Sequence, residues 1–142
     1  MIVLSAITQN NFNNIGYMDV KLENILKTIS QQENTVLIVN SIKGSLVGKL
    51  GQLRQGIAEY KQPLLNVYLS ADLQKNKVRL DAARTKAIVS GYDIFSTVGD
   101  LLSGSPSARS HKYGLSLFKE SETRRDCHAT GVSQSMCPCK IE

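Results

Sequence analysis

The residues with most potential for chemistry follow an apolar run near the middle of the chain. Gly44 and Gly48 precede Lys49, an order that phosphate-binding loops also show after a strand. Such a loop needs four residues between its glycines, and a Ser or Thr after the lysine to reach Mg²⁺. Here three residues separate the glycines, and Leu50 follows the lysine. We therefore expect these glycines to serve tight turns instead of a nucleotide site.

The three cysteines, Cys127, Cys137 and Cys139, lie together near the end of the sequence. Their spacing lacks the pair-and-pair arrangement of a structural zinc site, and His128 is the nearest histidine. In an oxidising compartment an odd count leaves one cysteine to pair elsewhere, whereas in the cytosol all three are free thiols. The sequence leaves the disulfide pairing open.

The titratable residues form no arrangement typical of catalysis. His111 and His128 lie in polar surroundings near basic residues, and we expect both at the surface. Asp93 and Asp100 fall in a predicted helix, where N-terminal capping and solvent exposure explain them. These patterns predict no catalytic residue.

Three apolar runs predict strands, at residues 2–7, 35–39 and 63–69. The second is apolar throughout and rich in β-branched residues, which is typical of a parallel strand covered on both faces. A helix predicted from Asp19 to about residue 31 separates the first two strands. This order predicts a right-handed strand-helix-strand unit.

The two predicted helices carry recognisable start signals. In the first, Asp19 is a plausible N-cap, and Glu23 lies one turn before Lys27. In the second, over residues 91–103, Ser90 and Asp93 are spaced like a capping box. Its apolar residues share one face: Ile94, Phe95, Val98, Leu101 and Leu102.

Composition excludes some classes of partner. The 142-residue chain has a formal charge of +5 and a pI near 9.2, but its basic residues are spread along the sequence without interleaved aromatics. We therefore expect no specific nucleic-acid binding. No stretch reaches the roughly 20 apolar residues of a membrane span. The composition changes after Gly104, which predicts an α/β domain over residues 1–104 and a cysteine-containing tail over residues 105–142.

In this order, the segments resemble the C-terminal part of a sulfatase-like family of animal proteins in the alkaline phosphatase superfamily, a family whose function is not established. Where that family has a strand and loop of the type NTVLIVMSDHG, the chain reads NTVLIVNSIKG. A helix of the type FDIYATLLDLL corresponds to YDIFSTVGDLL, and the cysteine-bearing end also matches. The resemblance implies a partial sulfatase-like α/β fold, with a mostly parallel sheet flanked by helices and an irregular C-terminal tail.

The resemblance also gives a meaning to the loop after the second strand. In active relatives an Asp-His pair there ligates the metal ions used in hydrolysis of sulfate or phosphate esters. Those positions are Ile42 and Lys43 here. Ile has no donor atom, and Lys is a cation that would repel the metal. The family's nucleophile motif lies upstream of the region that the chain covers, so we expect a pseudoenzyme or fragment with no metal or other cofactor.

The rival hypothesis is a non-catalytic binding module. Lys43, Lys49 and Arg54 would form a basic surface that captures an anion such as a sulfated glycan. A partial sheet would also leave an unpaired strand edge, through which the chain could self-associate. The family resemblance implies the secretory pathway or the extracellular space, although the N-terminus lacks the features of a signal peptide.

Overall fold

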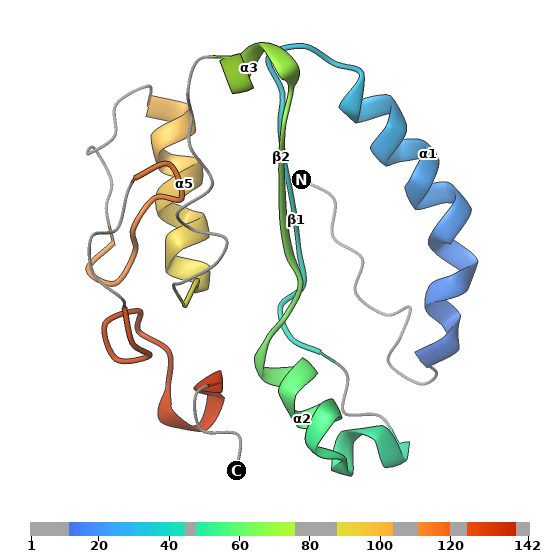
Figure 1. The fold of residues 1–142 in the computed structure, drawn as a ribbon, viewed down its shortest axis with the longest axis vertical. Helices are drawn as coiled ribbons and strands as arrows, with labels where there is room; N and C mark the ends of the chain where they lie inside the picture. The colour runs from blue at the N-terminus through green and yellow to red at the C-terminus, as the bar shows by residue number, and fades with distance from the viewer. Residues whose placement is uncertain (1–11, 45–47, 76–87, 104–110, 120–124, 139–142) are drawn as a thin grey trace. The chain divides into compact units, whose positions relative to one another are not determined.

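The computed structural model describes residues 12–44, 48–75, 88–103, 111–119 and 125–138 (Figure 1). The chain divides into two compact units. The first unit comprises Met1–Lys75 and Lys140–Glu142, and the second comprises Asn76–Cys139. The predicted strand at residues 2–7, and with it the strand-helix-strand unit, lies outside the described residues.

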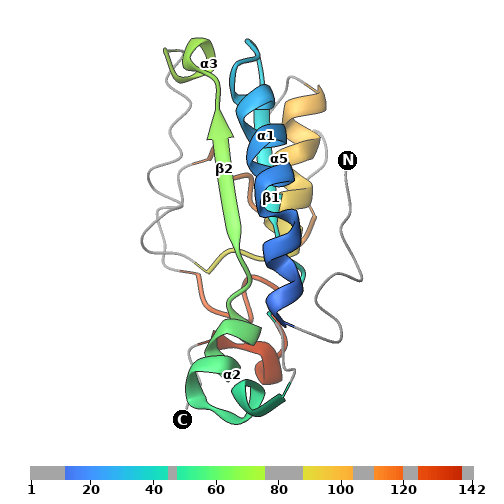
Figure 2. The same cartoon turned by 90° about the vertical axis from the view of Figure 1, so that its right-hand side faces the viewer.

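The first unit contains two paired strands, β1 (Val36–Asn40) and β2 (Leu65–Leu69), which lie side by side in Figures 1 and 2. Both predicted strands are confirmed. The pair is antiparallel, with Val36 opposite Leu69 and Asn40 opposite Leu65. The prediction of a mostly parallel sheet is therefore wrong for the sheet that the structure describes.

The connection between the strands explains their direction. It holds a 3-10 helix, η2 (Gly48–Gln52), and a short α-helix, α2 (Arg54–Lys61). Its two ends meet, because the Ser41 N–H donates to the Leu64 carbonyl at 2.9 Å and the Leu64 N–H donates to Ser41 Oγ at 2.8 Å. With Ser41 and Leu64 adjacent, β2 must run back along β1. An apolar run indicates how well a strand is covered and carries no information about its direction.

The helix before β1, α1 (Asp19–Ser30), runs along the strand pair (Figures 1 and 2). The predicted pair of Glu23 and Lys27 is confirmed as an exposed ion pair at 2.7 Å. The prediction of Asp19 as N-cap is wrong. Asp19 is the first helical residue, because a 3-10 helix, η1 (Phe12–Met18), leads directly into α1 and places Met18 at the cap.

A polar turn joins the start of β1 to the end of β2 and to α3 (Ala71–Lys75). Asn34 has a left-handed backbone, with φ of 51°, and its N–H donates to Asp72 Oδ2 at 2.9 Å. The Thr35 N–H donates to Ser70 Oγ at 3.0 Å. The hydrogen bond from the Ser70 side chain, followed by that from Asn34, lowers the pKa of Asp72 below its ordinary value of 3.8.

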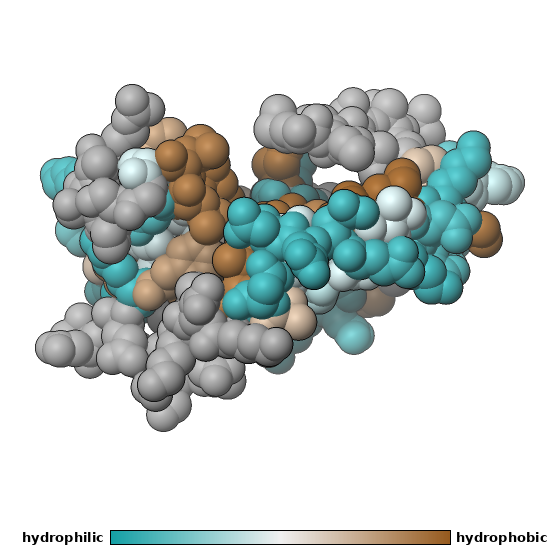
Figure 3. Space-filling view, turned by 90° about the horizontal axis from the view of Figure 1, so that it is seen from above, coloured by the Kyte–Doolittle hydropathy of each residue, from teal (hydrophilic) through white to brown (hydrophobic). Residues whose placement is uncertain are grey.

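The second unit is built around α5 (Gly91–Ser103), which confirms the second predicted helix, and also contains η3 (Gln134–Met136). The buried residues of α5 are Asp93, Ser96 and Thr97. Its apolar side remains accessible, with Phe95 58% and Leu102 84% exposed. Hydrophobic residues are accordingly visible at the surface in Figure 3. In the part of the chain that the structure describes, no helix is long and apolar enough to cross a membrane.

The turn at Asp72 gives a pH-dependent prediction. Because the folded pKa of Asp72 is lowered, its ionised form stabilises the fold above pH 3.8, and that contribution is lost as the pH falls through the lowered pKa. We expect Asp72→Asn to melt at a lower temperature than the wild type near pH 6, and the two melting temperatures to converge near pH 2. Thermal melts across this range measure the difference. Glu33→Gln, which removes the same charge from an exposed residue, controls for net charge, and a constant gap at all pH values would contradict the prediction.

Candidate functional site

The loop after β1, residues 41–44, is the segment where the family resemblance implies metal ligands. Ile42 is 88% exposed. Lys43 is also exposed, and its Nζ lies 5.5 Å from the centre of the Tyr60 ring, within cation–π range. In the described part of the chain, no group of three His, Cys, Asp or Glu side chains is placed to hold a metal ion.

Gly44 fixes this loop against α2. A Cβ at Gly44 would lie 2.4 Å from the Glu59 carbonyl oxygen, so only glycine allows this approach. Its N–H points at the Tyr60 carbonyl at 3.5 Å. Gly48 starts η2 with φ of +69°, a left-handed conformation that glycine adopts without strain. Both glycines therefore have structural roles that need no bound phosphate.

The three predicted anion-binding cations belong to the loop, η2 and α2. Lys43, Lys49 and Arg54 are all exposed. Arg54 is the first residue of α2, whereas Lys43 lies against Tyr60 near the end of that helix. Six residues of α-helix separate these two points by about 9 Å. The three cations are therefore spread along the connection between β1 and β2.

The second unit contains a buried carboxylate, that of Asp93, which is 1% exposed. Oδ2 accepts hydrogen bonds from the N–H of Ser90 at 2.7 Å and from its hydroxyl at 3.1 Å. Oδ1 accepts the Leu115 N–H at 2.7 Å and pairs with Arg125 Nη1 at 2.6 Å. Each oxygen therefore has two donors, and the carboxylate has little remaining capacity to act as a base or metal ligand.

Thr97 and Arg125 extend this network of buried hydrogen bonds along α5. Thr97 is fully buried, and its hydroxyl donates to the Asp93 carbonyl at 2.6 Å and accepts the Leu117 N–H at 2.9 Å. Arg125 Nη2 donates to the carbonyls of Tyr113 and Ala129. The polar side of α5 thus supplies hydrogen-bond partners to two later segments, one with Leu115 and Leu117 and the other with Arg125.

The sequence did not predict the buried hydrogen-bond network around Asp93 as a whole. The capping-box spacing correctly placed the Asp93 carboxylate on the Ser90 N–H. The prediction that solvent exposure explains Asp93 is wrong, because Arg125 and Leu115 bury and satisfy it. Arg125 is 32 residues away in sequence, and no local pattern marks it as the partner.

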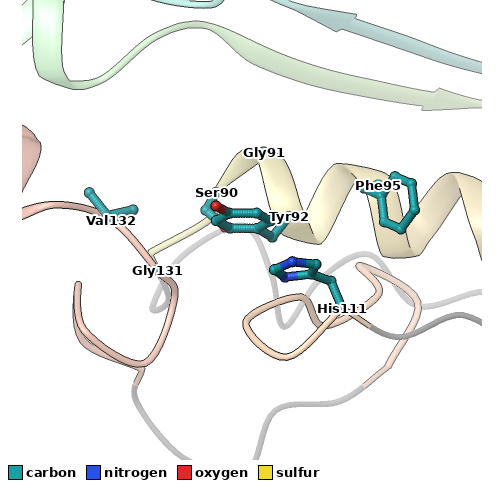
Figure 4. Close-up of a pocket in the computed structure, with 7 residues that line it drawn as sticks. All are labelled: Ser90, Gly91, Tyr92, Phe95, His111, Gly131 and Val132. Atoms are coloured by element: carbon teal, nitrogen blue, oxygen red, sulfur yellow. The ribbon is translucent and has the colours of Figure 1, made fainter.

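A pocket of about 440 Å³, partly open to solvent, lies at the start of α5 (Figure 4). The rings of Tyr92 and His111 stack within it, with centroids 4.2 Å apart and planes 6° from parallel. His111 is exposed, as predicted, and its Nδ1 accepts the Tyr113 N–H at 3.3 Å. His128 is exposed as well. The pocket is lined by Ser90, Gly91, Tyr92, Phe95, His111, Gly131 and Val132.

One disulfide closes the end of the second unit. Cys127 and Cys137 are bonded, with their Cα atoms 5.8 Å apart, and both are buried. This finding resolves the pairing that the sequence left open. Cys139 lies outside the described residues.

The structure is that of a mixed α/β protein whose C-terminal unit is closed by a disulfide. A family model described as protein of unknown function (DUF229) matches residues 1–142, and the chain belongs to this sulfatase-like family. The family resemblance inferred from the sequence is thereby confirmed. No curated protein and no solved structure matches the chain.

The buried ion pair gives a prediction about stability. Arg125→Met removes the cation and leaves the Asp93 carboxylate buried without its charge partner, so we expect a loss of about 3–5 kcal/mol in the free energy of unfolding. Lys27→Met is the matched control, because it breaks the exposed pair with Glu23 and should cost no more than about 1 kcal/mol. Urea unfolding of the two variants measures both values. Equal losses in the free energy of unfolding would show that burial of the Asp93 carboxylate does not require the charge of Arg125.

Proposed function

We propose that this chain is a non-catalytic member of its sulfatase-like family and that it does not carry out metal-dependent hydrolysis of sulfate or phosphate esters. The observation that carries the proposal is the pair Ile42 and Lys43, at positions where the family resemblance implies a metal-binding Asp-His pair. A hydrolase of this kind needs the metal to activate the nucleophile and to neutralise charge on the transferred group.

The surroundings of Lys43 support this proposal. A metal ion close to its ammonium group would meet a like charge instead of a ligand. The Tyr60 ring provides Lys43 with a favourable electrostatic partner in the fold, so the side chain already has a structural role. Ile42, almost fully exposed, contributes neither a donor atom nor buried apolar surface.

Calorimetric titration with Zn²⁺, Mn²⁺ and Ca²⁺, together with an assay of aryl sulfate and aryl phosphate hydrolysis, tests the proposal. We expect the wild-type chain to show no stoichiometric binding that depends on this loop and no turnover that EDTA abolishes. Recording the titration with the Cys127–Cys137 disulfide intact excludes zinc binding by these two cysteines. Ile42→Asp with Lys43→His, which restores the family pair, should raise metal affinity relative to the wild type. EDTA-sensitive turnover by the wild type would refute the proposal.

A second candidate function is capture of an extended polyanion such as a sulfated glycan. It is favoured by the exposure of Lys43, Lys49 and Arg54 and by their spread over the loop, η2 and α2. Exposed cations attract a polyanion through interactions that salt screens. The Tyr60 ring beside Lys43 adds an apolar surface next to the charges.

Heparin affinity chromatography tests this second function. We expect Lys43→Glu and Lys49→Glu each to lower the salt concentration needed for elution, and the double variant to lower it further, because each change reverses one contacting charge. Lys21→Glu makes the same change of charge on an exposed residue of α1 and should have a smaller effect. If Lys21→Glu weakens retention as much as the other changes, only net charge is being measured and no defined surface exists.

A further inference from the structure

The loop closed by the disulfide, residues 127–137, is attached to α5 at two points. Just before the loop, Arg125 pairs with the buried Asp93. Within it, Gly131 has φ of +69°, and a Cβ there would lie 2.8 Å from Tyr92 Cε2 and 2.9 Å from the Tyr113 ring. The disulfide loop therefore packs directly on the start of α5 and forms one wall of the pocket there (Figure 4).

The disulfide is a major constraint on this loop. The regular structure within it is the three-residue η3, and its backbone is held by short-range bonds such as Val132 N–H to the Cys127 carbonyl at 2.8 Å. The buried apolar side chains of the loop are those of Cys127 and Cys137 themselves. Closing so short a loop restricts the unfolded chain by an amount equivalent to roughly a 100-fold change in population.

We propose that the Cys127–Cys137 disulfide is a redox-sensitive lock that keeps Arg125 on Asp93. A dithiol reductant supplies two electrons and two protons, the S–S bond breaks to give two thiols, and the reductant becomes a disulfide. The released loop carries Arg125 away from Asp93, because only Asp126 separates Arg125 from Cys127 and because Arg125 Nη2 donates to the Ala129 carbonyl within the loop. The Asp93 carboxylate then loses its cation, and Gly131 leaves the Tyr92 ring.

The consequence is a local opening of the second unit in a reducing compartment and a closed unit in an oxidising one. The segments that depend on α5 for hydrogen bonds are the first to be released. Their reporters are the Leu115 N–H, bound to Asp93 Oδ1, and the Leu117 N–H, bound to Thr97 Oγ1. The lock involves none of the residues assigned to metal or anion binding. The test of the lock is therefore independent of the tests of the proposed function.

Amide hydrogen exchange by NMR tests the lock on the full chain carrying Cys139→Ala, in which only Cys127 and Cys137 can pair. Spectra are recorded with the disulfide intact and after reduction with dithiothreitol. We expect the protection of the Leu115 and Leu117 amides to fall roughly 100-fold on reduction. The Ser41 amide, bound to the Leu64 carbonyl in the first unit, is the internal reference and should keep its protection.

Arg125→Met separates the lock from general loosening of the loop. In the oxidised variant the Leu115 amide should already have lost most of the protection that reduction removes from the parent chain. Reduction of the variant should then have little further effect, which is the non-additivity expected of two changes acting through one contact. Glu23→Gln, in the exposed pair of α1, should leave the response of Leu115 to reduction unchanged.

Three results would overturn the lock. Equal protection of Leu115 in the oxidised and reduced chains would show that Arg125 stays in place without the disulfide. If reduction lowers the protection of the Leu115 amide in Arg125→Met as much as in the parent chain, the disulfide acts through a contact other than that of Arg125 with Asp93. Simultaneous loss of protection at the Ser41 amide would show that the disulfide stabilises both units and not the second unit alone.

Discussion

The second unit depends on the carboxylate of Asp93, which is buried with two hydrogen-bond donors on each oxygen. A buried charge is costly unless it is paired and fully hydrogen-bonded. The Asp93 carboxylate is therefore tolerated only because all of these donors are present. Ser90 is local to the helix, but Leu115 and Arg125 belong to later segments of the chain. One side chain thereby links the start of α5 to two segments that have little regular structure of their own.

Within the second unit, α5 buries its polar side. The irregular segments carry backbone N–H groups that need acceptors, and the polar side of α5 provides them through Asp93 and Thr97. That side is therefore buried, whereas Phe95 and Leu102 remain accessible. The unit gains specificity from the satisfied side chains of Asp93 and Thr97 and from covalent closure by Cys127–Cys137, and among its described residues few large apolar side chains are buried.

The first unit follows a different logic, in which chain connectivity determines the sheet. Reciprocal hydrogen bonds between Ser41 and Leu64 close the connection and force β2 to return antiparallel to β1. The same connection positions Lys43 on Tyr60 and places Gly44 against α2. The segment where the family resemblance implies metal chemistry thus packs against α2 through Lys43 and Gly44.

The sequence by itself determined the elements whose signals are local: α1 and α5, the strands β1 and β2, the ion pair of Glu23 with Lys27, and the bond from Ser90 to Asp93. It also determined the family, because the order of the motifs along the chain can be read without knowing which residues are in contact. Only the tertiary structure decided the strand direction, the cysteine pairing and the partner of Asp93. These features join residues far apart in sequence, and apolar periodicity reports which residues share a face without reporting what packs against that face.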